Sequence, residues 1–84
     1  MNNWRKLLNQ VLRGTSDANV PFEDLCHLLV RLGFEQRTSG SHNIFRRAGI
    51  AERPNLQREG NKAKPYQVRQ VRDIIVKHKL GEEI

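Results

Sequence analysis

The chain has 84 residues, a formal net charge of +6 and a single cysteine, Cys26. A chain of this length forms one small domain with little room for an enclosed substrate cavity, so we expect function on a surface or in a shallow groove. One cysteine excludes an internal disulfide, and neither a membrane-spanning run of ~18 apolar residues nor a signal-peptide region is present. We therefore expect a cytoplasmic protein without membrane contacts and with Cys26 in the core.

The first segment, residues 1–15, has the pattern of an amphipathic helix. Its apolar residues recur at helical spacing as Trp4, Leu7, Leu8, Val11 and Leu12. Asn2 or Asn3 is a suitable N-cap, and Gly14 is a suitable stop. We expect this helix to pack on its own sheet, on a second copy or on a partner, beside a domain that spans residues 16–84.

A second helix and a β-hairpin are expected next. The helix begins at Pro21, because proline is favoured at a first helical position, and ends before Gly33. Two strands then follow, Phe34–Ser39 and His42–Arg47, joined by a turn at Gly40-Ser41. This turn delivers His42 to the start of the second strand.

The remaining elements complete an α+β pattern. Ile50–Gln57 reads as a third strand that Pro54 weakens, which suits an edge or a bulge. Arg58–Lys64 reads as a basic loop and Pro65–Lys79 as a last helix. The order predicts a three-stranded antiparallel sheet packed on one face by two helices, with the N-terminal helix as an addition.

The positive charge is concentrated in one half of the chain. Between Arg37 and Arg72 there are nine cations and two anions, a net charge of +7, so the rest of the chain sums to −1. Such a basic region is typical of a protein that binds a polyanion. A generic basic surface, or a surface for an acidic protein partner, is the alternative.

His42 is the candidate for chemistry. A histidine can take and give a proton near neutrality, and Arg46, Lys62 and Lys64 are candidates to hold a phosphate beside it. His27 and His78 are expected to be structural. Strand alternation places His42 with Ile44 on one face and Asn43 with Phe45 on the other, without deciding which face is buried.

Other site chemistries find little support in the sequence. No group of histidines, cysteines or acids has metal-ligand spacing, and no nucleophilic triad or phosphate loop is present, so we expect no metal and no cofactor. The start of the last helix is a second candidate for phosphate binding, since helix N-termini attract anions and Lys62, Lys64, Arg69 and Arg72 flank it. A solvated basic face is the alternative there.

Several short motifs in matching order resemble the HicA family of toxins. They are Leu32-Gly33-Phe34, Gly40-Ser41-His42-Asn43-Ile44-Phe45, Asn55-Leu56-Gln57 and Ala63-Lys64-Pro65-Tyr66-Gln67-Val68. The resemblance covers roughly residues 16–81. It implies a fold like the double-stranded RNA-binding domain, a ribonuclease that cuts messenger RNA and blocks translation, a catalytic histidine at His42, and a HicB-type antitoxin as partner. The family commonly has a second histidine where this chain has Asn43, and an apolar strand residue where it has Pro54.

The resemblance and the charge pattern together predict a metal-independent endoribonuclease. His42 is expected to remove the proton of an RNA 2′-hydroxyl, which then attacks the adjacent phosphorus, while cations offset the charge on the phosphoryl oxygens. The residues expected to contact RNA are Gly40, Ser41, Arg46, Arg47, Lys62, Lys64, Arg69 and Arg72. A non-catalytic RNA-binding module of the same fold is the first alternative, and an adaptor that binds protein or DNA is the second.

Overall fold

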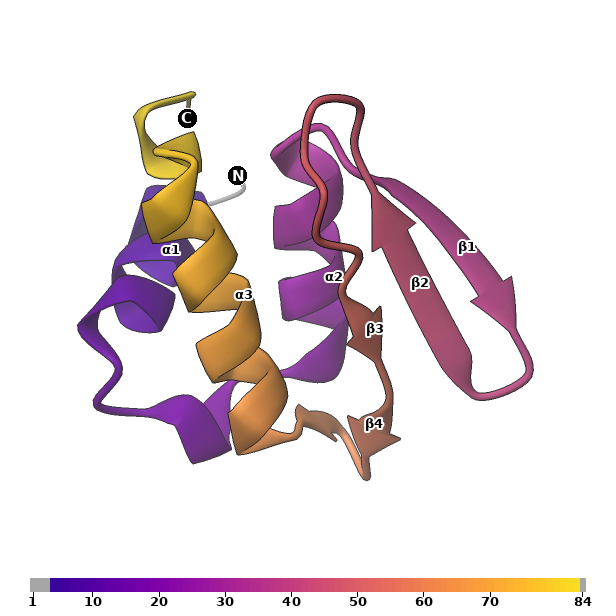
Figure 1. The fold of residues 1–84 in the computed structure, drawn as a ribbon. Coiled ribbons are helices and arrows are strands. Elements are labelled where there is room, and N and C mark those ends of the chain that lie inside the picture. The colour runs from indigo at the N-terminus through magenta and orange to yellow at the C-terminus, as the bar shows by residue number, and fades with distance from the viewer. Residues whose placement is uncertain (1–3, 84) are drawn as a thin grey trace.

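The computed structural model describes residues 4–83, which form an α+β fold (Figure 1). Its α-helices are α1 (Trp4–Arg13), α2 (Phe22–Arg31) and α3 (Pro65–Lys77). An antiparallel sheet has the order β1-β2-β3, with β1 at Glu35–Ser39, β2 at His42–Arg46 and β3 at Asn55–Leu56. A smaller hairpin joins β4 (Arg58–Glu59) to β5 (Lys62–Ala63), and short 3-10 turns occupy Asp17–Asn19 and Leu80–Glu83. The predicted α+β class with a three-stranded antiparallel sheet is confirmed.

The N-terminal helix packs within the same domain. Leu8 and Val11 of α1 are fully buried in the same cluster as the apolar residues of α2 and α3. Figure 1 shows α1 beside α3, with α2 between these helices and the strands. The predicted caps of this helix, Asn2 and Asn3, lie outside the described residues.

The burial of Phe45 shows which face of the sheet packs against the core. Its side chain is fully buried with Leu56 of β3, whereas His42 and Arg46 are exposed and Ile44 is half-buried. Burial of a phenylalanine side chain stabilises the fold by about 2–3 kcal/mol, which is enough to fix the register of the strand. His42, Ile44 and Arg46 therefore lie on the outer face of the sheet.

The third strand is much shorter than predicted. Only Asn55–Leu56 pairs with β2, while Ile50 makes an isolated bridge to Arg47. Pro54 has no N–H to donate and is buried, and its carbonyl accepts a hydrogen bond from the Phe45 N–H at 2.9 Å. The chain from Ile50 to Pro54 consequently runs as a loop and joins the sheet only after the proline.

Other predicted boundaries are corrected as well: α2 begins at Phe22, with Pro21 as its N-cap, and β2 ends at Arg46. The expected basic loop at 58–64 contains the β4–β5 hairpin, because Gly60, with φ +62°, closes a two-residue turn. Phe34 is not in the strand, since its N–H caps α2 by donating to the Leu29 carbonyl. The last helix ends at Lys77 rather than Lys79, where the chain adopts a positive φ of 56°. Among residues 4–83, none of the helices has the length and apolar character that crossing a membrane requires.

Candidate active site

His42 stands at the tip of the β1–β2 hairpin, on the outer face of the sheet. Gly40, with φ +60°, occupies the first position of the two-residue turn, where a positive φ is required and glycine provides it without strain. Ser39 and His42 form the first pair of the ladder. The turn thus places His42 at the start of β2, as the sequence predicted, and the structure adds that its imidazole is exposed.

Asn55 is the first partner of the imidazole. Asn55 pairs with Ile44 in the sheet, so its side chain is a diagonal neighbour of His42 on the outer face. Its Oδ1 lies 3.2 Å from Nδ1 of His42. A carbonyl oxygen only accepts hydrogen bonds, so this contact is satisfied by the tautomer that carries its proton on Nδ1, and that tautomer has its lone pair on Nε2.

Gln57 is the second partner and faces the other ring nitrogen. Its Nε2 donates to Ser41 Oγ at 3.3 Å and lies 3.5 Å from His42 Nε2. The second distance is at the limit of a hydrogen bond, so the Nε2 lone pair is weakly engaged. Ser41 accepts from Gln57 and keeps its hydroxyl hydrogen for another acceptor. Asn55 and Gln57 were not predicted as site residues.

The residue after His42 belongs to the opposite face. Asn43 accepts hydrogen bonds at Oδ1 from Thr38 (3.0 Å) and Gln36 (3.2 Å), and its Nδ2 donates to the Leu56 carbonyl (3.3 Å). The Asn43 amide therefore links β1, β2 and β3 through side-chain hydrogen bonds. A side chain at position 43 therefore cannot share the outer face with His42.

Cationic side chains lie beside Ile44 and beyond it along the sheet, because Arg37 pairs with Ile44 and Arg46 follows two residues later. Arg46 lies on the same face as His42, four residues and about 13 Å further along the strand, and makes only an exposed 3.5 Å ion pair with Glu35. Arg37 and Arg53 are exposed and have no ion-pair partner among residues 4–83. A groove of about 810 Å³ brings these groups together, lined by Val30, Phe34, Glu35, Gln36, Arg37, Ile44, Arg46 and Arg53. Arg37 and Arg53 were not among the predicted contact residues.

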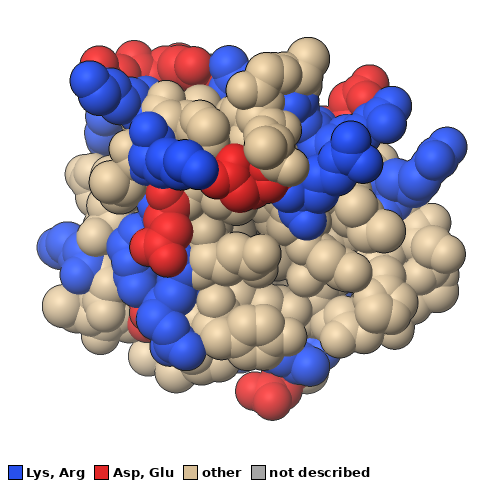
Figure 2. All heavy atoms as spheres, in the orientation of Figure 1, with Lys and Arg blue, Asp and Glu red and all other residues tan. Residues whose placement is uncertain are grey.

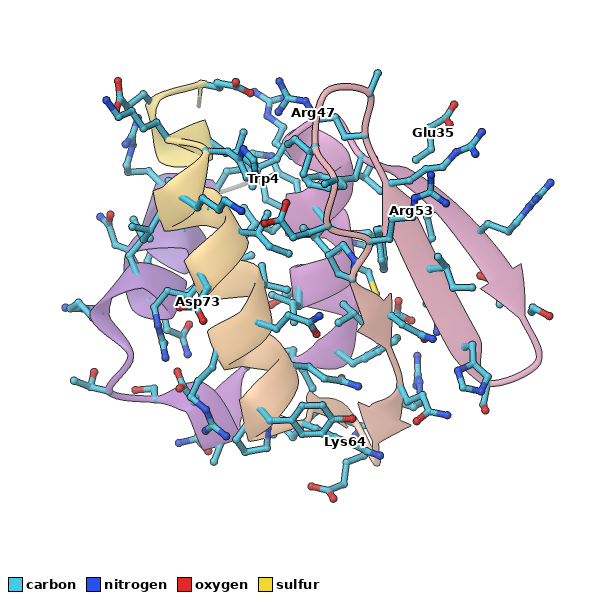
Figure 3. All side chains as sticks on the ribbon, viewed as in Figure 1. Trp4, Glu35, Arg47, Arg53, Lys64 and Asp73 are labelled. Atoms are coloured by element: carbon cyan, nitrogen blue, oxygen red, sulfur yellow. The ribbon has the colours of Figure 1, made fainter. Side chains whose placement is uncertain are left out.

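The charges are unevenly spread along the sheet. Figure 2 shows basic groups at the upper right, near the end of β2 away from the turn, and a largely uncharged surface over the lower ends of the strands. Figure 3 places Arg53 and Glu35 at that upper end and Lys64 at the start of α3, beside β4. The imidazole is thus at the uncharged end of a strand whose other end is basic.

Two of the residues predicted to contact RNA, Arg47 and Arg72, instead hydrogen-bond to other parts of the protein. Arg47 donates to the Leu32 carbonyl at 2.7 Å and to both carboxylate oxygens of Glu83, at 2.9 and 3.1 Å. Arg72 donates to both oxygens of Asp17, at 3.0 and 3.2 Å, and to the Val11 carbonyl at 3.1 Å. The hydrogen bonds to the carboxylates of Glu83 and Asp17 raise the pKa of the Arg47 and Arg72 guanidinium groups, respectively. Both side chains hold the fold together in this structure.

The other predicted contacts remain on the surface. Lys62 and Arg69 are exposed, Lys64 is half-buried, and none has an ion-pair partner within residues 4–83. Gly40 is at the open tip of the hairpin, where an added Cβ would meet nothing within 4 Å. Gly40 is thus at the hairpin tip, whereas Lys62, Lys64 and Arg69 lie in β5, just before α3 and in α3.

The remaining histidines and the cysteine have structural surroundings. His27 packs edge-on against Trp4, and His78 Nε2 lies 2.9 Å from Glu52 Oε1. Burial, and secondly the charge of Glu23, raise the pKa of the Cys26 thiol to about 11. Residues 4–83 contain no group of three or more histidines, cysteines or acids placed to hold a metal ion.

In comparisons with known proteins, no family model, no curated protein and no solved structure matches this chain.

Proposed function

We propose that the protein is an endoribonuclease toxin of the HicA type, which cleaves messenger RNA without a metal and thereby blocks translation. The observation that carries the proposal is the contact between His42 Nδ1 and Asn55 Oδ1, because it leaves a basic Nε2 on an exposed strand end. The order of α2, the three strands and α3 agrees with a fold like the double-stranded RNA-binding domain.

RNA supplies its own nucleophile in the proposed reaction. Nε2 of His42 takes the proton of a 2′-hydroxyl, and the 2′-oxygen forms a bond to the adjacent phosphorus. The bond from phosphorus to the 5′-oxygen then breaks, and the leaving oxygen takes a proton from solvent. The products are a 2′,3′-cyclic phosphate and a 5′-hydroxyl, and the imidazolium returns its proton to solvent. A positioned base accelerates such a step by about 10²–10⁴-fold.

The basic groove supplies the binding surface in this proposal. Arg37, Arg46 and Arg53 lie along the outer sheet face beyond His42. A single strand laid along β2 places one phosphodiester at the imidazole and the next phosphates at these guanidinium groups, which suit phosphate oxygens. A HicB-type antitoxin that covers the outer face would mask both the base and the groove in the cytoplasm.

The test compares His42→Ala with His27→Ala, an exposed histidine that packs on Trp4 outside the site. Wild type and His27→Ala should arrest growth on induction, and both should cut RNA in the presence of a chelator to ends with a 2′,3′-cyclic phosphate. His42→Ala should lose at least 10²-fold in cleavage rate. Undiminished cleavage by His42→Ala contradicts the proposal.

A non-catalytic RNA-binding module is the second candidate, and the cations of the groove favour it independently of His42. Arg37 and Arg53 have no ion-pair partner among the described residues, so they are free to bind phosphates whether or not the histidine acts as a base. Salt-dependent RNA binding by the wild type without cleavage products would select this function.

A further inference from the structure

The amide of Gln57 occupies the space next to the basic nitrogen of His42. Its Nε2 carries two hydrogens, of which one is directed to Ser41 Oγ at 3.3 Å. The other is available toward His42 Nε2, 3.5 Å away. A 2′-hydroxyl that replaces this weak contact at Nε2 brings its phosphodiester against the same amide.

A buried glutamine fixes the position of residue 57. Gln67, in the first turn of α3, is the one fully buried polar side chain among the described residues. Its Oε1 accepts a hydrogen bond from the Gln57 main-chain N–H at 3.3 Å, and its Nε2 contacts the Tyr66 hydroxyl at 3.4 Å. A buried amide is costly unless its groups are hydrogen-bonded, so Gln67 and the Gln57 backbone depend on each other.

We infer that Gln57 is a second catalytic residue, which donates a hydrogen bond to a non-bridging oxygen of the scissile phosphate, and that Gln67 positions it. The inference rests on the proposed ribonuclease function and names the group that stabilises the charge developing on the phosphoryl oxygens. The Lys62, Lys64 and Arg46 side chains were predicted for this task. The backbone of Arg46 lies about 13 Å along the strand from that of His42, whereas Nε2 of the Gln57 amide lies 3.5 Å from Nε2 of the imidazole.

Hydrogen-bond donors that the protein holds in place stabilise a transition state effectively, because they need not reorient as charge develops on the substrate. Ser41 Oγ fixes one end of the Gln57 amide and Gln67 fixes its backbone, so the free N–H is aimed before the substrate binds. Removal of one such donor from an enzyme costs about 10²–10³-fold in kcat. Because Gln57 is half-buried rather than enclosed, we expect the lower end of that range.

The test uses Gln57→Ala and the nearly isosteric Gln57→Met, with Gln10→Ala in α1 as the control glutamine. Both Gln57 variants should lose about 10²-fold in kcat with little change in KM, while Gln10→Ala should match wild type. A substrate with sulfur in place of one non-bridging oxygen accepts hydrogen bonds poorly. Wild type should therefore cleave one phosphorothioate diastereomer more slowly than the other, and both Gln57 variants should lose that discrimination.

Gln67→Met tests the positioning role. This variant should keep RNA binding and lose part of both kcat and the diastereomer discrimination, at a temperature well below its measured melting point. A purely structural Gln67 would change the melting temperature and leave the discrimination intact.

The outcomes separate the inference from the proposed function. If wild type does not cleave RNA, or if His42→Ala cleaves as wild type does, the proposed function fails and the inference fails with it. If His42→Ala is inactive while both Gln57 variants keep wild-type kcat and discrimination, the inference alone is overturned.

Discussion

Arg72 and Arg69 lie on the same helix, α3, and have different surroundings. The Arg72 guanidinium makes a two-pronged ion pair with Asp17 and a third hydrogen bond to the Val11 carbonyl, so it ties α3 to the end of α1 and the turn after it. The side chains of the pair are 19% and 14% exposed, respectively. Arg69, three residues earlier, is exposed and has no ion-pair partner within residues 4–83.

The expected loss of stability in Arg72→Ala follows from this geometry. Breaking a buried ion pair by removing one partner costs about 3–5 kcal/mol, and the remaining exposure of this pair argues for the lower figure, about 3 kcal/mol. For a domain of this size each kcal/mol shifts the melting temperature by about 4–8 °C, so a fall of at least ~12 °C is expected. Arg69→Ala should change the free energy of unfolding by less than about 0.5 kcal/mol.

The assays are urea unfolding of both variants and RNA binding well below their melting temperatures. Asp17→Ala and the double variant complete a mutant cycle, in which the two losses should be strongly non-additive because the side chains touch. Arg69→Ala should weaken RNA binding, and Arg72→Ala should not. An Arg72→Ala protein that is as stable as wild type but binds RNA weakly would refute the reasoning.

Two further predictions concern titratable groups. Hydrogen bonds from Lys77 (2.8 Å) and His78 (2.9 Å) lower the pKa of Glu52 from its usual 4.5 to about 2. The stability that this carboxylate contributes is therefore present above about pH 4.5 and is lost as the pH falls toward 2. Glu52→Gln should therefore be less stable than wild type at pH 7, and urea unfolding across this pH range should show the difference shrinking; a constant difference contradicts the assignment. Cys26, with its pKa raised to about 11, should resist a thiol reagent at pH 8 in the folded protein and react once urea unfolds it, and rapid labelling without denaturant contradicts its burial.

Local patterns account for the part of the fold that was predicted. The apolar spacing of α1, α2 and α3 and the turn glycine before His42 are signals carried by neighbouring residues. These signals placed His42 at a strand start, which the structure confirms. They did not place Asn55 and Gln57, because Pro54 interrupts the segment and the register of β3 follows from where the chain rejoins the sheet.

The roles of two arginines depend on distant residues. Arg72 meets Asp17, 55 positions earlier, and Arg47 meets Glu83, 36 positions later. No local pattern marks such partners, so charge counting assigned both arginines to the RNA surface. The role of Gln67, in contrast, is visible in the sequence. Gln67 lies four residues before Val71 and seven before Ile74, which places it on the apolar stripe of α3. A polar residue on a buried stripe indicates a specific hydrogen-bonding role.

The basic half of the chain therefore contributes less free positive charge than its sequence suggests. Arg47, Arg58 and Arg72 pair with Glu83, Glu23 and Asp17, and Arg46 makes a longer, more exposed pair with Glu35. All four carboxylates lie outside that half.

The cations of the basic half that have no ion pair within residues 4–83, or only the exposed one of Arg46 with Glu35, fall into two groups. Arg37, Arg46 and Arg53 lie along the outer sheet face, and Lys62, Lys64 and Arg69 lie around the start of α3. In the function we propose, a phosphate backbone held by the first group would run along β2 toward the hairpin tip, where His42 Nε2 and the Gln57 amide lie 3.5 Å apart. Because the surface at that end carries little charge, the proposed reaction would rely on the held Gln57 donor to stabilise the charge that develops on the phosphate.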